Sequence, residues 1–138
     1  MDDLRIAQQR LKNQRLSLVF VKNSKVVFET NTEGLSGFLR AIEQLNNELS
    51  RASVADRTIG KAAALLCAYS NVTAAFATTL SKKGAEILRT FNISFEFENL
   101  VPAILNSEKT SNCPLEELVE NITKPIVAYA RIREYCGH

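Results

Sequence analysis

Two short segments of the sequence combine residue types that could bind or transform a small molecule. The first is Ala55-Asp56-Arg57-Thr58-Ile59-Gly60-Lys61, where a predicted strand ends and a predicted helix begins. Lys61 falls in the first helical turn, where the helix dipole disfavours a cation, and Gly60 is a poor helix residue. Residues that break local rules together at such a turn indicate a site.

Each residue of this segment has a chemical and a structural interpretation. Gly60 would let a ligand approach the backbone closely, with Thr58 beside it. Lys61 could bind an anion, pair with Asp56, or act as an amine nucleophile if desolvated. In the structural interpretation, Asp56 or Thr58 caps the helix, Gly60 permits tight packing, and the Lys61 side chain extends to solvent.

The second segment is Thr110-Ser111-Asn112-Cys113-Pro114-Leu115-Glu116. Pro114 fits the first position of a helix, which makes Cys113 the N-cap residue. A thiol at a helix N-terminus is a better nucleophile, although Glu116, two residues after Pro114, would oppose this effect with its negative charge. The alternative is an inert Cys113 that closes a loop.

The other cysteines and the histidine exclude several kinds of site. Cys67 lies in an alanine-rich predicted helix and Cys136 near the end of the last helix, so both are interpreted as structural, and no cysteine spacing resembles a zinc site. His138 is the only histidine, so a Ser-His-Asp triad, a Cys-His dyad or a histidine-based metal site is not expected. We expect no cofactor. Three separated cysteines without a signal peptide predict a cytoplasmic location.

Composition and charge narrow the class of protein. The 138 residues are 46% hydrophobic and 23% charged, with a net charge of +2, which predicts one globular domain over residues 1–138. The longest uncharged apolar run, Ala62 to Ser81, is broken by polar residues, so no membrane partner is expected. The mild basic excess in residues 1–25 fits a solvated helix face, so no nucleic-acid partner is expected. The oligomeric state stays open.

The order of predicted elements indicates an α/β protein. Strands are expected at 16–21, 25–30, 53–57, 72–80 and 93–98, and helices at 2–13, 35–49, 59–69, 82–91, 114–122 and 125–135. Strands that alternate with helices after a first hairpin predict a mixed five-stranded sheet covered by helices. Ligands of such sheets bind outside the carboxyl ends of the strands. Gly34 and Ser36 open the helix expected at 35–49, where Gly34 could clear space for a ligand and Ser36 is favoured as a cap.

The chain resembles an uncharacterised family with a cytidine-deaminase-like fold, known as a domain of unknown function. Four stretches carry the resemblance: Leu16 to Lys22, Val54 to Leu66, Glu98 to Pro102, and Cys113 to Glu116. The resemblance implies a three-layer α/β/α sandwich and strengthens the assignment of Asp56 to Lys61 as a site.

The resemblance does not imply deamination. A zinc deaminase needs His-x-Glu at the start of one helix and Pro-Cys-x-x-Cys at the start of the next. By element order these motifs would fall near Gly34-Leu35-Ser36 and near Ile59 to Ala63, and neither stretch offers a zinc ligand.

The most favoured function is a metal-free domain that binds a small anionic or nucleotide-like molecule where helix N-termini face a pocket. The expected ligand-binding residues are Gly60, Thr58, Thr110, Gly34 and Ser36. The first alternative is a zinc-independent enzyme that uses Cys113 as nucleophile, supported by Lys61 and Asp56. A second alternative is a protein-interaction module without a ligand.

The two chemical segments are expected to form a single site. The Cys113 thiol should lie beside Asp56, Gly60 and Lys61, with Thr110 and Pro102 in the pocket wall. The Lys61 ammonium should be held by Asp56 or by pocket oxygens, because an unpaired buried cation is unstable.

Overall fold

One mixed sheet organises the computed structural model, which describes residues 2–106 and 111–138. Its strand order is β2-β1-β3-β4-β5. β1 (Leu18–Lys22) runs antiparallel to both β2 (Lys25–Thr30) and β3 (Ser53–Ile59). β3, β4 (Ala74–Ser81) and β5 (Ser94–Val101) are parallel to one another. The expected mixed five-stranded α/β sheet is confirmed.

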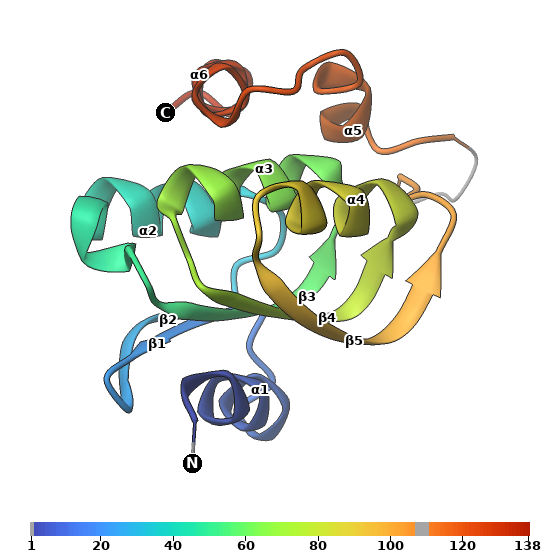
Figure 1. Ribbon diagram of the computed structural model, residues 1–138. Coiled ribbons are helices and arrows are strands. Elements are labelled where there is room, and N and C mark those ends of the chain that lie inside the picture. Colours follow the sequence, from blue (N-terminus) through green and yellow to red (C-terminus); the bar gives the residue numbers. More distant parts are fainter. Residues whose placement is uncertain (1, 107–110) are drawn as a thin grey trace.

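Helices cover both faces of this sheet (Figure 1). α1 (Asp3–Asn13) lies on one face, and α2 (Ser36–Leu45), α3 (Lys61–Ser70) and α4 (Lys82–Thr90) lie on the other. α5 (Pro114–Leu118) and α6 (Pro125–Tyr135) pack on the outer side of this helical layer, so they add a further layer to the expected α/β/α sandwich. None of the helices in the described part of the chain combines the length and apolar character needed to cross a bilayer.

Two apolar cores lie on the two faces of the sheet. Val19 and Val21 of β1 pack with α1, whereas Leu18 and Phe20 pack with the helices opposite. This division follows from the strand geometry, because successive side chains point to opposite faces. The nearly uncharged run predicted at 72–80 forms β4, which lies between β3 and β5 and is buried on both sides at Ala75, Phe76 and Ala77.

Three helix boundaries differ from the sequence prediction by two residues or more. The helix expected at 35–49 ends at Leu45, because Asn46 has a left-handed φ of 48° and a short 3-10 turn, Asn46–Leu49, follows it. The helix expected from Ile59 begins at Lys61, because β3 continues to Ile59. The helix expected at 114–122 covers only Pro114–Leu118.

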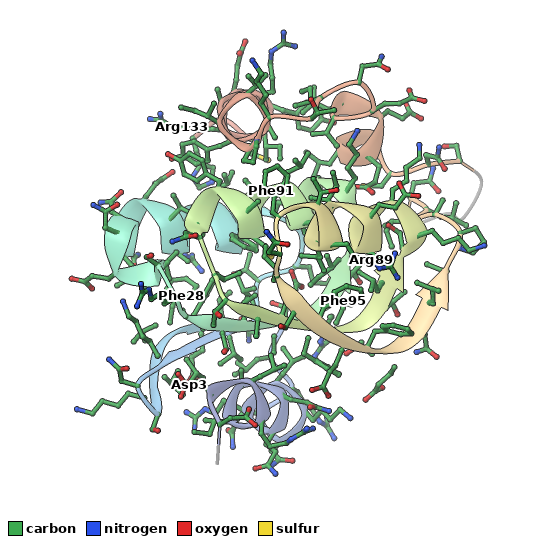
Figure 2. All side chains as sticks on the ribbon, viewed as in Figure 1. Asp3, Phe28, Arg89, Phe91, Phe95 and Arg133 are labelled. Carbon is green, nitrogen blue, oxygen red and sulfur yellow. The ribbon has the colours of Figure 1, made fainter. Side chains whose placement is uncertain are left out.

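Polar contacts attach α1 to the β1–β2 turn and to the edge strand β5. The Asp3 carboxylate accepts hydrogen bonds from the backbone N–H groups of Asn23 and Ser24 in the β1–β2 turn, at 3.0 and 2.8 Å (Figure 2). At the far edge, Lys12 forms an ion pair with Glu98 of β5. These contacts keep α1 centred over the sheet.

α6 is attached to α3 through an apolar face and an aromatic pair. Ala128 and Ile132 are fully buried. The ring of Tyr129 stacks on that of Tyr69 in α3, with centroids 4.2 Å apart. Ile126, in the first turn of the same helix, is 68% exposed.

We therefore expect the two isoleucines of α6 to differ in their effect on stability. Ile132→Ala should lower the free energy of unfolding by about 2–4 kcal/mol, because it leaves a cavity in the core. Ile126→Ala should change it by less than about 0.5 kcal/mol. Urea denaturation monitored by circular dichroism measures both values, and equal effects of the two substitutions would contradict the observed packing of α6.

Candidate functional site

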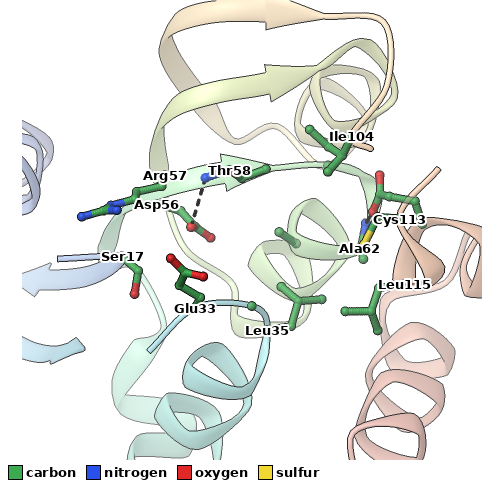
Figure 3. A pocket seen from close by; sticks show the side chains of 14 residues that line it. Ser17, Glu33, Leu35, Asp56, Arg57, Thr58, Ala62, Ile104, Cys113 and Leu115 are labelled. Atoms are coloured by element: carbon green, nitrogen blue, oxygen red, sulfur yellow. Dashed lines mark hydrogen bonds between the residues drawn. The ribbon is translucent and has the colours of Figure 1, made fainter. Parts of the chain in front are cut away.

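A cavity of about 380 Å³ lies at the carboxyl end of β3, beside the N-terminus of α3 (Figure 3). Its lining side chains divide by chemistry. Ser17, Glu33 and Asp56 form a polar end, and Leu35, Ala62, Ile104 and Leu115 provide apolar wall. Cys113 lies beside Ala62, away from the polar end. Cys113 and the strand-to-helix segment that contains Asp56 and Gly60 therefore line the same cavity, as expected.

Asp56 is the titratable group at the centre of the polar end. It lies opposite Leu18 of β1 and Ala77 of β4, so its side chain points to the face covered by α3. Its carboxylate accepts a hydrogen bond from the Thr58 backbone N–H at 3.3 Å. Burial raises the pKa of Asp56 from 3.8 to about 7, although the Thr58 and Arg57 backbone N–H groups act to lower it. Near neutral pH this carboxyl can therefore accept or donate a proton.

Charge at the polar end is negative. The carboxyl group of Glu33 faces the same part of the cavity as that of Asp56 (Figure 3). Among the described lining residues the only cationic side chain is Arg57. Its guanidinium points away and donates hydrogen bonds to the carbonyl oxygens of Leu16 and Arg15, at 2.7 and 2.9 Å.

The N-terminus of α3 is capped by a carboxylate from α5. Glu116 Oε1 accepts a hydrogen bond from the Lys61 backbone N–H at 2.7 Å, and Oε2 accepts one from the Ala62 N–H at 2.9 Å. The N-cap residue of α3, Gly60, has no side chain that could do this. Glu116 thus binds the free amides and the positive end of the helix dipole, as an anion does.

Gly60 is needed for this contact. A Cβ atom at Gly60 would lie 2.6 Å from the Cδ atom of Glu116, closer than real side chains approach. The space that the sequence analysis assigned to a ligand next to Gly60 is therefore filled by the Glu116 carboxylate. The Glu116 carboxylate, which the sequence places near the Cys113 thiol, is bound to the N–H groups of α3.

Lys61 does not join the main cavity. Its ammonium donates a hydrogen bond to the backbone carbonyl oxygen of Glu120 at 2.8 Å. Together with Pro102, Lys61 lines a second, much smaller cavity of about 40 Å³. Of the two expected partners of the ammonium, Asp56 is therefore wrong, and an oxygen of Glu120, which lines this second cavity, takes its place. The group of Lys61 that contacts the lining of the main cavity is its backbone N–H, which donates to Glu116.

Cys113 is the N-cap residue of α5, as predicted, with Pro114 at the first position. The helix has only five residues, so its dipole is weaker than the sequence analysis assumed. The structure brings several predicted site residues to one cavity, namely Asp56, Thr58, Gly60, Gly34 and Cys113. It leaves Lys61, Pro102 and Ser36 outside that lining, and Thr110 lies outside the described residues.

Ser36 has a different partner from the one expected. The N-cap of α2 is Leu35, without a side-chain cap, so the predicted capping role of Ser36 is wrong. Its Oγ instead lies 2.9 Å from His138 Nε2, and His138 Nδ1 lies 2.8 Å from Glu43 Oε1. Ser36, His138 and Glu43 thus form a serine–histidine–carboxylate contact that the sequence analysis did not anticipate. The Glu43 side chain is 41% exposed and none of the three residues lines the cavity, so we assign this contact to holding the end of α6 on α2.

Several lining residues carry no signal in the sequence. Ser17, Glu33, Leu35 and Ile104 lie in turns or at element ends and join the cavity only through the tertiary fold. Glu116 did have a signal. A helix that starts at Gly60, which has no side chain, needs an acceptor from elsewhere in the chain.

The comparison with known families identifies the chain. The model of the family described as a domain of unknown function, DUF1893, matches residues 6–136. The chain belongs to the DUF1893 family. A solved DUF1893 protein from Thermotoga maritima is 25% identical to it, with a TM-score of 0.88, over 96% of this chain and 89% of that one. No curated protein matches the sequence.

Two more distant structures relate to the fold of this DUF1893 protein. RibD from Acinetobacter baumannii is 15% identical, with a TM-score of 0.54 over 70% of this chain and 35% of that one. This likeness supports the fold alone, and the expected cytidine-deaminase-like fold is confirmed. A dCMP deaminase from the cyanophage S-TIM5 is 12% identical, with a TM-score of 0.49 over 69% of this chain and 93% of that one. This TM-score is too low to support the fold assignment.

We expect Glu116→Ala to destabilise the protein by about 1–3 kcal/mol, because two N–H groups of α3 lose their acceptor. Glu117→Ala is the matched control, since Glu117 is an exposed neighbour on the same short helix. Its effect should stay below about 0.5 kcal/mol. Chemical denaturation of both variants measures the difference, and a Glu116 variant as stable as the control would contradict the capping role.

We also expect the stability difference between Asp56→Asn and the wild type to depend on pH. The raised pKa of Asp56 means that between about pH 4 and pH 7 the folded chain binds more protons at this site than the unfolded chain. Its contribution to stability therefore falls as pH rises through this range. At pH 8 Asp56→Asn should be more stable than the wild type by about 1–3 kcal/mol, and at pH 4 the gain should vanish. A gain that is the same at both pH values would show that the Asp56 carboxyl is not destabilised by its surroundings.

Proposed function

We propose that this DUF1893 protein binds a small organic molecule in the cavity that contains Asp56 and Cys113, without a catalytic metal ion. The observation that carries the proposal is Asp56 itself. Its carboxyl group has a pKa near 7 and faces a cavity in which no described cation is directed at it. Such a group weakens the fold at neutral pH, and proteins accept this cost mainly at functional sites.

The size and lining of the cavity support a small ligand. Pockets for small molecules have volumes of about 300–1,000 Å³ and combine apolar walls with a few polar groups. The cavity, at about 380 Å³, falls in the lower part of this range. Leu35, Ile104 and Leu115 would bury the body of the ligand, and Ser17 and Asp56 would orient its polar part.

The residues present do not fit the zinc ion of the zinc deaminases. The two stretches where its ligands would fall, Gly34 to Ser36 and Ile59 to Ala63, supply no His, Cys or acidic side chain. No group of three His, Cys, Asp or Glu side chains gathers anywhere in the described part. The start of α3 is instead bound by Glu116.

A second candidate function is an enzyme that uses Cys113 as nucleophile. It is favoured by the presence of Cys113 and Asp56 in one cavity, where Asp56 could exchange a proton with the reacting groups. Support from Lys61 is no longer part of this candidate, because its ammonium is held at Glu120. We also propose a cytoplasmic location, which agrees with the three free thiols of the chain.

The two candidates can be separated with one labelling experiment. Cys113 lines the cavity, whereas Cys136 is a half-buried thiol near the end of α6. Iodoacetamide alkylation of both, followed by mass spectrometry, reports on the cavity with an internal control. Fragments that raise the melting temperature should slow alkylation of Cys113 several-fold and leave Cys136 unchanged. Failure of every such fragment to protect Cys113 would overturn ligand binding in this cavity.

The reaction of Cys113 without a ligand tests the enzyme. A catalytic thiol should be alkylated rapidly near neutral pH, and its pH profile should shift in Asp56→Asn. A Cys113 that reacts no faster than an ordinary exposed thiol, with a profile unchanged in Asp56→Asn, leaves ligand binding as the function.

A further inference from the structure

We infer that the ligand of this cavity is a small organic cation, with an amine or amidine head at Asp56 and Glu33 and an apolar body toward Leu115. The inference rests on the proposed function and names its ligand class. It departs from the anionic or nucleotide-like ligand expected from the sequence.

The charges around Asp56 decide the sign of the ligand. From the loop before α2, the Glu33 carboxyl faces the same end of the cavity (Figure 3). From α3, the buried Cys67 thiol has a pKa raised by burial and by the nearby Asp56 charge, so it stays neutral. On β3 itself, the Arg57 guanidinium points away, toward the carbonyl oxygens of Leu16 and Arg15.

The anion-binding group at the start of α3 is already used. Helix N-termini bind anions through their free backbone N–H groups. At α3, the N–H groups of Lys61 and Ala62 both donate to Glu116. An anion in the cavity would therefore meet the carboxyl groups of Asp56 and Glu33 without the N–H donors of α3, and like charges repel.

A cation meets the opposite situation. Its N–H groups can donate to Asp56 and Glu33, and a buried carboxylate is stable when it is paired and hydrogen-bonded. Leu35, Ala62 and Leu115 then offer apolar wall for the rest of the molecule. Hydrogen bonds from the cation to Asp56 would also offset the unfavourable free energy of its partly desolvated carboxylate.

This pairing makes binding depend on pH in a defined direction. The cation needs the ionised form of Asp56, whose pKa in the free protein is about 7. Binding should lower this pKa and release a proton. Affinity for a permanent cation should therefore rise by up to about tenfold between pH 6 and pH 8.

The test uses three probes of nearly equal size and different charge: benzamidine, benzamide and benzoate. Their binding to the full chain is measured by calorimetry at pH 6 and pH 8, and Cys113 alkylation locates the site. Benzamidine should bind most tightly, gain affinity from pH 6 to pH 8, and protect Cys113. Asp56→Asn should weaken it at least tenfold and abolish the pH dependence, Glu33→Gln should weaken it less, and Glu117→Gln should have no effect.

The outcomes separate this inference from the proposed function. If benzoate binds at least as tightly as benzamidine, or if Asp56→Asn leaves benzamidine binding unchanged, the ligand class is wrong while the cavity remains a binding site. If benzamidine fails to bind but uncharged or anionic fragments protect Cys113, the ligand class is again wrong. If no probe or fragment protects Cys113, the proposed function fails as well.

Discussion

The carboxylate of Glu116 on the first two N–H groups of α3 is the contact on which the site depends. It joins the short α5 helix, and with it the segment that carries Cys113, to the central helix of the molecule. It also neutralises the N-terminus of α3, and thereby leaves the two acidic groups of the polar end without the positive dipole of that helix. This pairing therefore contributes to the part of the cavity wall that carries Cys113 and Leu115.

Much of the fold could be predicted because the signals are local. β4 is a short run of small and β-branched residues without charge, and such a run is stable mainly in the interior of a sheet. The hairpin β1–β2 has two apolar runs around a polar turn, and α2 has apolar residues at helical spacing. The boundary at Asn46 was less predictable because it depends on a residue with a left-handed φ. The end of α5 at Leu118 has no local sequence signal.

The site was predictable only in part. Gly60 and Lys61, two residues that are unfavourable at a helix start, correctly marked the turn at the cavity. The carboxylate that caps this helix start lies 55 residues away in the sequence, and no local rule could assign it. Cys113 could be placed at a helix start because Pro114 follows it. Glu33 could not be predicted, since its position near Asp56 depends on how the loop before α2 passes the end of β3. Lys61 was misassigned because its backbone, and not its side chain, is the group that the site uses.

The burial of α3 has a consequence for how the chain folds during synthesis. Most helices on a sheet keep one polar face toward water. In α3, however, every residue from Ala62 to Cys67 is buried, since the sheet covers one side and α5 and α6 cover the other. While residues 111–138 are still inside the ribosome, the outer side of α3 has no cover. The nascent chain then presents an alanine- and leucine-rich surface that can associate with other chains. The polar contacts of the last segment, at Glu116 and at His138, give it two fixed points from which to close over that surface as soon as it emerges.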